Sequence, residues 1–304
     1  MADDGLILVT GAGGGVGGVG RTVVRLLCER GRPVRAMVHH DDKRADALRA
    51  LGAQVVVGDL TRPDEVANAL DGGSRMFFGM SVSPSYLEAA ATVATVARAL
   101  GALEVLVGIS QMTVSRMTPL STEESHQQRL HWLSEQVLDW SVLPIVHIRP
   151  TVFLDNPFFT TLAARSIADS GTIRLPFGTG RTSPVAADDV AQVVAAVLED
   201  PRPHLGHVYE LTGFRSQEMT GIAEEYSRAL GRKVTYVDVP FDTWADQIVS
   251  PAGFPPHTEE HILTMARLHH LNRYDRATRD VESILGRPAK TVEEFIAERA
   301  DLFT

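Results

Sequence analysis

The sequence predicts an α/β fold with a doubly wound parallel sheet, and three observations support this prediction. An apolar segment at 6–9 leads into a glycine-rich stretch, hydrophobic residues then recur at helical spacing until Gly31, and a second apolar segment follows at 34–38. This order is that of a strand, a helix and a strand, and the alternation continues along the chain. Parallel strands need crossover helices and are buried on both faces, so the first half is predicted to be a Rossmann unit.

The other elements of the first half follow from the same two periodicities. Ser121 and Glu124 have the spacing of a capping box, which predicts a helix from there to about Asp139. The remaining predicted elements, in order, are a helix at 42–50, a strand at 54–57, a helix at 64–70, a strand at 75–80, a helix at 85–100, a strand at 105–109 and a strand at 145–148.

Beyond Pro150 the pattern is less regular. Asn156 is predicted to begin a helix, Asp188 and Asp189 to cap a helix that ends at Leu198, and Thr291 to cap a late helix. Late strands are predicted at 208–211 and 234–239. We therefore predict a Rossmann domain at 1–155 and a smaller C-terminal α/β substrate-binding region at 156–304, partly interleaved with the sheet.

Composition excludes several classes of protein. The chain has 304 residues, 44% of them hydrophobic, but no apolar run approaches the about 18 residues of a membrane span. Residues 1–4 lack the basic region of a signal peptide, which predicts a cytoplasmic protein without a membrane partner. A net charge of -9 argues against a nucleic-acid partner. The oligomeric state is left open.

Metal and disulfide chemistry are not expected. Cys28 is the single cysteine, so it cannot form an internal disulfide, and its apolar neighbours on the first helix predict a buried structural role. His269 and His270 have no accompanying carboxylate or cysteine cluster, so no metal site is predicted.

The glycine-rich stretch predicts a dinucleotide site. Glycine lets the backbone approach a pyrophosphate, and the N-terminus of the following helix attracts its charge. The motif fits in more than one register: GxxGxxG at Gly11, Gly14 and Gly17 or at Gly14, Gly17 and Gly20, and GxGxxG at Gly15, Gly17 and Gly20.

Several further segments carry a family resemblance. Together with the glycine turn, the segments 34–38, 58–60, 134–138, 149–153 and 184–191 resemble the NmrA-like branch of the atypical short-chain dehydrogenases. The resemblance implies NAD(P) binding. It leaves the activity open, because relatives include quinone and azo-dye reductases, isoflavone-type reductases, aromatic polyketide tailoring enzymes and non-catalytic redox sensors. The glycine turn is three residues longer here than the usual family pattern.

The end of the second predicted strand bears on cofactor choice. An acidic residue there favours NAD, whereas a basic group favours the extra phosphate of NADP. This chain has His39, which His40, Lys43 or Arg44 could assist, so NADP is predicted to be preferred, with NAD possible. The alternatives are that Asp41 or Asp42 binds the ribose, or that these polar groups form a solvated loop.

Other cofactor contacts are expected at the strand ends. Asp59 resembles the family residue that holds the adenine amino group, although a turn or cap role is the alternative. The predicted cofactor-binding residues are Thr10, Gly11, Gly14, Gly15, Gly17, Gly20, His39, Asp59, Leu60, Gly79, Met80, Ser110, His131 and Pro150.

The usual catalytic pair of short-chain dehydrogenases is missing. In Tyr-x-x-x-Lys the lysine lowers the tyrosine pKa so that the phenol can transfer a proton. The residues four positions after the five tyrosines are Ala90, Gly213, Leu230, Pro240 and Thr278. Where the resemblance places the pair, the chain has Gln127 and His131. With an ordinary pKa near 6.5, His131 could donate a proton, and Ser110 could orient a carbonyl, so these two are the candidate catalytic residues.

The predicted substrate is a quinone-like or polycyclic aromatic compound, because a conjugated acceptor can take a hydride without a strong acid. Two alternatives stay open: a tailoring oxidoreductase of aromatic polyketide biosynthesis, and a non-catalytic NADP(H) sensor. The candidate substrate-binding residues are Gln111, Met112, Phe153, Asn156, Phe158 and Phe177.

Overall fold

The computed structural model describes residues 5–15 and 17–303 and confirms the predicted α/β fold. Its central sheet has seven strands, all parallel, in the order β3-β2-β1-β4-β5-β6-β9. The strands are β1 (Leu6–Val9), β2 (Val34–Val38), β3 (Gln54–Val57), β4 (Gly73–Phe78), β5 (Val105–Ile109), β6 (Ile145–Pro150) and β9 (Val208–Leu211). The strand order reverses between β1 and β4, which is where open sheets of this kind bind ligands.

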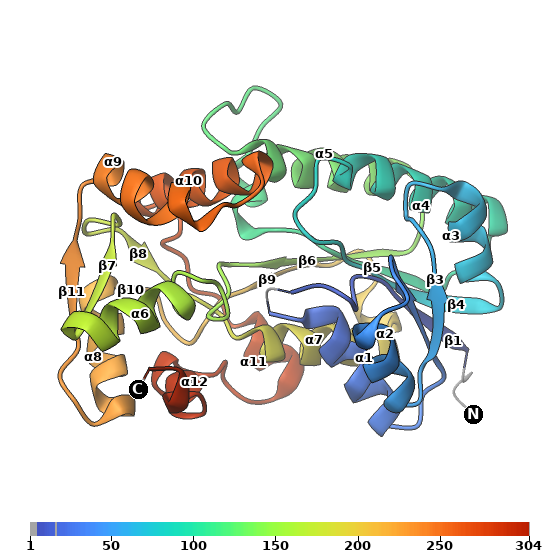
Figure 1. The fold of residues 1–304 in the computed structure, drawn as a ribbon. Coiled ribbons are helices and arrows are strands. Elements are labelled where there is room, and N and C mark those ends of the chain that lie inside the picture. The colour runs from blue at the N-terminus through green and yellow to red at the C-terminus, as the bar shows by residue number, and fades with distance from the viewer. Residues whose placement is uncertain (1–4, 16, 304) are drawn as a thin grey trace.

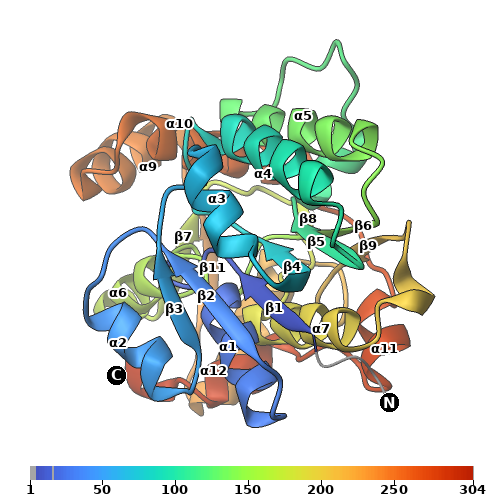
Figure 2. The ribbon, with the colours of Figure 1, turned by 90° about the vertical axis from the view of Figure 1, so that its right-hand side faces the viewer.

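Helices cover both faces of this sheet (Figures 1 and 2). One layer comprises α3 (Pro63–Leu70), α4 (Tyr86–Leu100) and α5 (His126–Trp140). The other comprises α1 (Val19–Glu29), α2 (Lys43–Ala50) and α7 (Ala187–Glu199), with α11 (Asp280–Leu285) packed on α7. Each layer closes its own apolar core on the sheet, so the central strands are buried on both faces as predicted, whereas the edge strands β3 and β9 are partly exposed.

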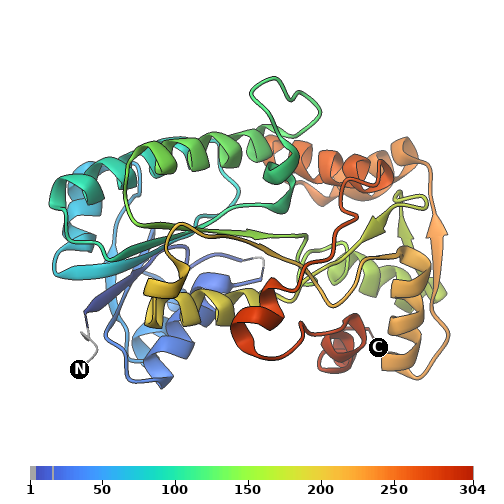
Figure 3. The ribbon, with the colours of Figure 1, turned by 180° about the vertical axis from the view of Figure 1, so that it is seen from behind.

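The C-terminal region has a third core of its own beyond the carboxyl ends of the strands. Its elements are α6 (Thr161–Ser170), β7 (Thr172–Leu175), β8 (Arg181–Thr182), β10 (Gln217–Glu218), α8 (Met219–Leu230), β11 (Thr235–Asp238), α9 (Phe241–Trp244), α10 (Pro256–His270) and α12 (Val292–Ala297). The chain between α10 and α11 then crosses from one layer to the other (Figure 3). Strand β9 and helix α7 belong to the Rossmann layers although they follow residue 155.

Two predicted helix starts are wrong. Helix α5 begins at His126, because Ser125 and Gln128 form the capping box, whereas the Ser121 hydroxyl accepts a bond from the Thr118 N–H in the preceding turn. Asn156 begins a turn and not a helix: its Oδ1 accepts from the Phe158 N–H at 3.0 Å, and α6 starts at Thr161. The predicted capping box at Thr291 is confirmed.

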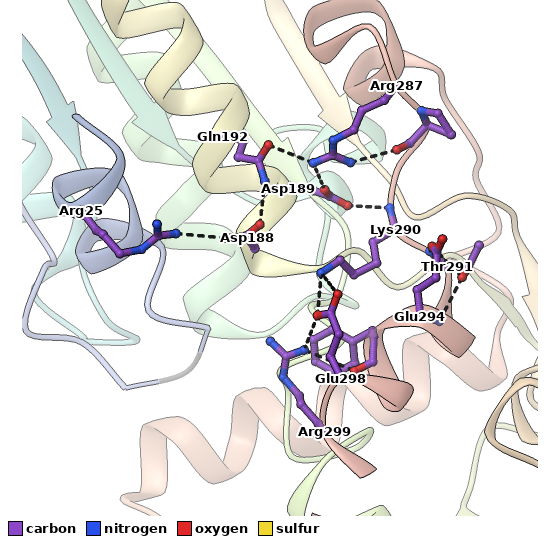
Figure 4. Close-up of polar contacts among 12 residues, drawn as sticks. Arg25, Asp188, Asp189, Gln192, Arg287, Lys290, Thr291, Glu294, Glu298 and Arg299 are labelled. Carbon is purple, nitrogen blue, oxygen red and sulfur yellow. Dashed lines mark hydrogen bonds and ion pairs between the residues drawn. The ribbon is translucent and has the colours of Figure 1, made fainter. Parts of the chain in front are cut away.

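The acidic pair at the start of α7 does not cap that helix. The first N–H of α7, that of Ala187, donates to Asp155 at 3.0 Å. Asp189 is fully buried and accepts from the Arg287 guanidinium at 2.8 Å and from the Lys290 N–H at 2.7 Å (Figure 4). Asp189 therefore holds the segment that joins α11 to α12 against the Rossmann layer.

Cys28 and the membrane prediction can be compared directly with the structure. Cys28 is partly buried and packs on the core that α1 shares with the sheet, and burial raises the pKa of its thiol.

Among residues 5–15 and 17–303, no helix is long and apolar enough to cross a membrane. The same residues contain no group of histidine, cysteine and carboxylate side chains that could hold a metal ion.

Candidate functional site

A cleft of about 440 Å³ lies at the carboxyl ends of β1 to β4. Four connections form its walls: the glycine turn after β1, the start of α2 with the end of β2, the turn after β3, and the connection from β4 to α4. The lining residues are Gly11, Gly13, Gly14, Gly15, Met37, Val38, His39, His40, Asp42, Arg44, Gly58, Asp59, Leu60, Thr61, Gly79, Met80, Ser81, Ser83 and Ser85.

The glycines of the turn have different structural roles. Gly11 has a φ of +71°, and a Cβ there would lie 2.7 Å from the Gly79 carbonyl oxygen, so a side chain is excluded. Gly15 lines the cleft with open space where a Cβ would be. Gly17 and Gly20 are outside the lining; they let α1 approach Ala187 and the backbone of the turn. Gly13, which the prediction omitted, also lines the cleft.

Thr10 has a structural role in joining two strand ends. Its hydroxyl donates to the Gly79 carbonyl at 2.8 Å and accepts from the Gly79 N–H at 2.9 Å. The side chain is buried and does not line the cleft. Thr10 thus fixes the end of β1 against the end of β4, the two strands between which the cleft opens.

Three side chains with nitrogen donors, His39, His40 and Arg44, gather at the β2 end of the cleft. The rings of His39 and His40 lie 4.5 Å apart, and both line the cleft. The Arg44 guanidinium donates to the Gly13 carbonyl at 2.9 Å and pairs with Asp42 at 2.5 Å. Arg44 is thereby held over the glycine turn and lines the cleft, whereas Lys43 is outside the lining.

The acidic residues of this loop are already engaged. Asp42 caps α2 by accepting from the Arg44 N–H, and its bonds to Arg44 lower its pKa to about 2. Asp41 lies 2.7 Å from the guanidinium of Arg49. Both carboxylates are therefore paired with arginines, and the basic side chains that line this end of the cleft are the two histidines and Arg44.

The β3 turn and the β4 connection form the rest of the cleft. One Asp59 oxygen accepts from the Thr61 N–H and hydroxyl, each at 2.9 Å, so this residue shapes the turn while also lining the cleft beside Leu60. Gly79 and Met80 line the opposite wall. Ser81 follows them in the lining, and Ser83 and Ser85 complete it. These last two were not predicted, because isolated serines in a loop give no sequence signal.

Ser110 and His131 lie behind this cleft. Both line a separate small cavity between β5, β6, α4 and α5. Burial lowers the pKa of His131 to about 3, so the expectation of an ordinary pKa is wrong and the ring is neutral at neutral pH. The residue at the other predicted catalytic position, Gln127, is fully buried and donates to His131 across 3.1 Å.

The predicted substrate residues divide into two groups. Gln111 and Met112 follow β5, and Phe153 bridges to Val185, all beyond the carboxyl edge of the sheet. Phe158 and Phe177 are fully buried, 5.5 Å apart, in the C-terminal core with Trp244 and His269. Pro150 ends β6 and, like Asn156, is outside the cleft lining.

The seven-stranded parallel sheet, and the cleft at the point where its strand order reverses, agree with the comparison of this sequence with known families. The NmrA-like family model matches residues 3–296. The chain belongs to the NmrA-like family.

Individual relatives of this NmrA-like chain cover nearly all of it. It is 29% identical to an NAD(P)H azoreductase from Xenophilus azovorans over 98% of this chain and 99% of that protein. Its structure resembles an NADPH-dependent quinone oxidoreductase from Escherichia coli complexed with NADPH, with a TM-score of 0.82, 21% identity, and coverage of 97% and 99%. It also resembles NmrA, a negative transcriptional regulator, in complex with NADP, with a TM-score of 0.80, 19% identity, and coverage of 97% and 94%. The shared fold therefore includes the C-terminal region.

Proposed function

We propose that this protein is an NADP(H)-dependent oxidoreductase that transfers hydride to a quinone-like or polycyclic aromatic acceptor. The observation that carries the proposal is the cleft, with open glycine backbone on one wall and three basic side chains at its β2 end. The azoreductase relative and the structural likeness to a quinone oxidoreductase support it, because both proteins reduce conjugated acceptors.

The described residues fit a dinucleotide. Gly13, Gly14 and Gly15 present backbone to the cleft without side chains that would block a pyrophosphate. Asp59 and Leu60 line the cleft beside the β3 turn, and we propose them as the adenine contacts. His39, His40 and Arg44 offer hydrogen-bond donors to the 2′-phosphate of NADP, whereas no free carboxylate among the residues lining this end favours NAD.

The chemistry proposed for the site depends on positioning. When bound, NADPH supplies a hydride, and a conjugated acceptor spreads the resulting negative charge over its ring system. The protein then needs to orient the acceptor and exclude water more than to supply a strong acid. We propose water as the final proton source. The Ser110 hydroxyl is buried beside the small cavity behind the cleft, so its proposed role is to hold the end of β5 in place and not to contact the acceptor. His131, buried and neutral, supports the site without titrating.

The acceptor is proposed to bind beyond the ends of β5 and β6. Gln111, Met112, Phe153 and Asn156 are the candidate contacts, and Phe158 with Phe177 forms the rigid aromatic core behind them. A planar aromatic compound fits such a surface. Intermediates of aromatic polyketide biosynthesis belong to this class of acceptor and should be included when substrates are tested.

Oxidation of NADPH, followed by its absorbance with a panel of quinones, azo dyes and polycyclic aromatic compounds, tests the proposal. We expect turnover with at least one acceptor and a lower KM for NADPH than for NADH. Tight binding of NADPH in calorimetry together with no turnover on the whole panel would reject the enzyme assignment.

A second candidate is an NADP(H) sensor that does not turn over. Two observations favour it: the Tyr-Lys pair is missing from the sequence, and the fold is shared with a transcriptional regulator in complex with NADP. The same two measurements separate the candidates, because a sensor binds the cofactor and alters a partner without consuming NADPH.

A further inference from the structure

The small cavity behind the cleft is lined by polar atoms that have no partner. Its volume is about 10 Å³, close to that of one water-sized sphere. Four side-chain atoms of the residues that line it make no hydrogen bond to any described residue: Ser110 Oγ, His131 Nδ1, Ser134 Oγ and His147 Nδ1. Buried polar atoms are almost always paired, because leaving one unpaired costs about 1–3 kcal/mol.

The proton position on His131 follows from its neighbours. The Ser83 backbone N–H donates to Gln127 across 3.1 Å, which identifies the acceptor as the amide oxygen. The amide nitrogen of Gln127 therefore faces His131 Nε2 and donates to it. Since the ring is neutral, its proton is on Nδ1, and that N–H faces the cavity.

His147 has the complementary arrangement. Its Nε2 lies 2.8 Å from an oxygen of Asp139, so Nε2–H donates to that carboxylate. With the proton on Nε2, Nδ1 is the nitrogen of this ring that can accept a hydrogen bond at the cavity. The remaining carboxylate at the cavity, Glu135, is bound by Arg149 through two guanidinium nitrogens. One donor, one acceptor and two hydroxyls are therefore left facing the same space.

We propose that this cavity is a binding site for one internal water that links His131 to His147 and orients the hydroxyl of Ser110. The water accepts from His131 Nδ1–H and the Ser134 hydroxyl, and donates to His147 Nδ1 and Ser110 Oγ. These four bonds satisfy all four unpaired atoms. Because Ser110 Oγ accepts from the water, the water fixes the buried Ser110 side chain at the end of β5.

This assignment makes His147 a positioning residue, and its catalytic consequence rests on the proposed function. A Ser110 side chain fixed in this way would hold the end of β5 in place beside the proposed acceptor site, so its effect on turnover is indirect. Gly108 lines the cavity, and a Cβ there would lie 3.9 Å from His147 Nδ1 and 3.4 Å from Leu138.

Two measurements test the water without requiring turnover. We expect ¹⁵N NMR of the full chain to show His131 as the Nδ1–H tautomer and His147 as the Nε2–H tautomer. We expect a high-resolution crystal structure to show one water within hydrogen-bond distance of all four atoms. An Nε2–H tautomer at His131, or a dry cavity in the crystal, would overturn the proposal even if the protein is an active reductase.

A matched pair of substitutions tests the role of His147. In His147→Gln the amide nitrogen reaches the place of Nε2 and keeps the bond to Asp139, but nothing replaces Nδ1. In His147→Asn the amide oxygen takes the place of Nδ1, because each is two bonds from Cβ. We expect kcat to fall about tenfold in the glutamine variant, less than the roughly hundredfold typical of deleting an oxyanion donor. The asparagine variant should recover part of that loss, and equal kcat values in the pair would contradict the role.

Gly108→Ala gives an independent test. The added methyl makes ordinary contacts, so the fold should persist while the water is displaced. We expect the same loss of kcat with an unchanged Kd for NADPH. A water retained in the crystal structure of this variant, or a wild-type kcat after its loss, would refute the positioning role. Absence of turnover in the unsubstituted protein would reject the proposed reductase function and leave the water site to the NMR and crystal tests.

Discussion

Replacing Asp189 with alanine should destabilise the protein much more than replacing its neighbour Asp188. The two residues are adjacent at the start of α7, yet only Asp189 is fully buried. It accepts from the Lys290 N–H at 2.7 Å and from Arg287 at 2.8 Å (Figure 4). Asp188 is partly exposed, accepts from Gln192 at 2.6 Å and lies 3.6 Å from Arg25.

The magnitude follows from what each substitution leaves behind. Without Asp189, the Lys290 N–H loses a charge-assisted hydrogen bond, worth about 1.5–3 kcal/mol. Arg287 is 40% exposed, so its guanidinium can be hydrated again and adds little. Asp188→Ala removes only a partly solvated ion pair and a surface hydrogen bond, worth about 0–1 kcal/mol. We therefore expect the free energies of unfolding of the two variants to differ by about 2 kcal/mol.

Urea unfolding monitored by circular dichroism measures this difference. The dependence of the free energy on urea should be the same in both variants, because the surface exposed on unfolding is unchanged. Only the midpoint should be lower in Asp189→Ala. Equal midpoints would show that the segment between α11 and α12 does not depend on Asp189, and would refute the reasoning.

Three further predictions concern the cofactor cleft and the buried histidines. Arg44→Ala should weaken NADP binding about tenfold and leave NAD binding nearly unchanged, because Arg44 lines the β2 end of the cleft. Lys43→Ala is the control, because Lys43 is outside the lining. Equal losses of affinity for both cofactors in calorimetry would contradict a phosphate contact of Arg44. Gly15→Ala should weaken cofactor binding without lowering Tm, because a Cβ at Gly15 meets no atom within 4 Å. Gly20→Ala should also lower Tm, because a Cβ at Gly20 would lie 2.9 Å from backbone atoms of the turn. An unchanged Tm for Gly20→Ala would count against this packing. Burial lowers the pKa of His131 and His269 to about 3 and of His261 to about 4. Below about pH 6.5 the unfolded chain therefore binds more protons than the folded protein. The free energy of unfolding should fall with the pH, by about 2 kcal/mol per histidine at about pH 5. Urea unfolding that gave the same free energy at about pH 7.5 and about pH 5 would exclude this.

Local patterns were sufficient to predict most of the fold. Strand and helix periodicities predicted the strands of the Rossmann half to within two residues at their ends, because most of these strands are largely apolar and the helices that cover them have an apolar stripe. The errors occurred where two local signals competed. Ser121 and Ser125 can each begin a capping box, and the backbone turn at Thr118 decided between them.

The candidate site was predicted less completely. Several residues that were predicted to lie at strand ends do line the cleft: those of the glycine turn up to Gly15, and His39, Asp59, Leu60, Gly79 and Met80. The roles of these residues as cofactor contacts, and the boundary at residue 155, stay predictions. Assigning Gly17 and Gly20 to packing required the position of Ala187 and of the turn backbone, which no spacing rule contains.

The sequence by itself determined the alternation of strands and helices, the glycine turn and the missing Tyr-Lys pair, because each depends on residues that are close together in the chain. Only the tertiary structure decided which polar groups are free to act. Asp41 and Asp42 are bound by arginines, Asp189 holds a segment about a hundred residues away, and His131 is neutral and faces His147 across a cavity. A side chain's charge and partners depend on burial and on contacts between distant segments, and these exist only after the chain has folded.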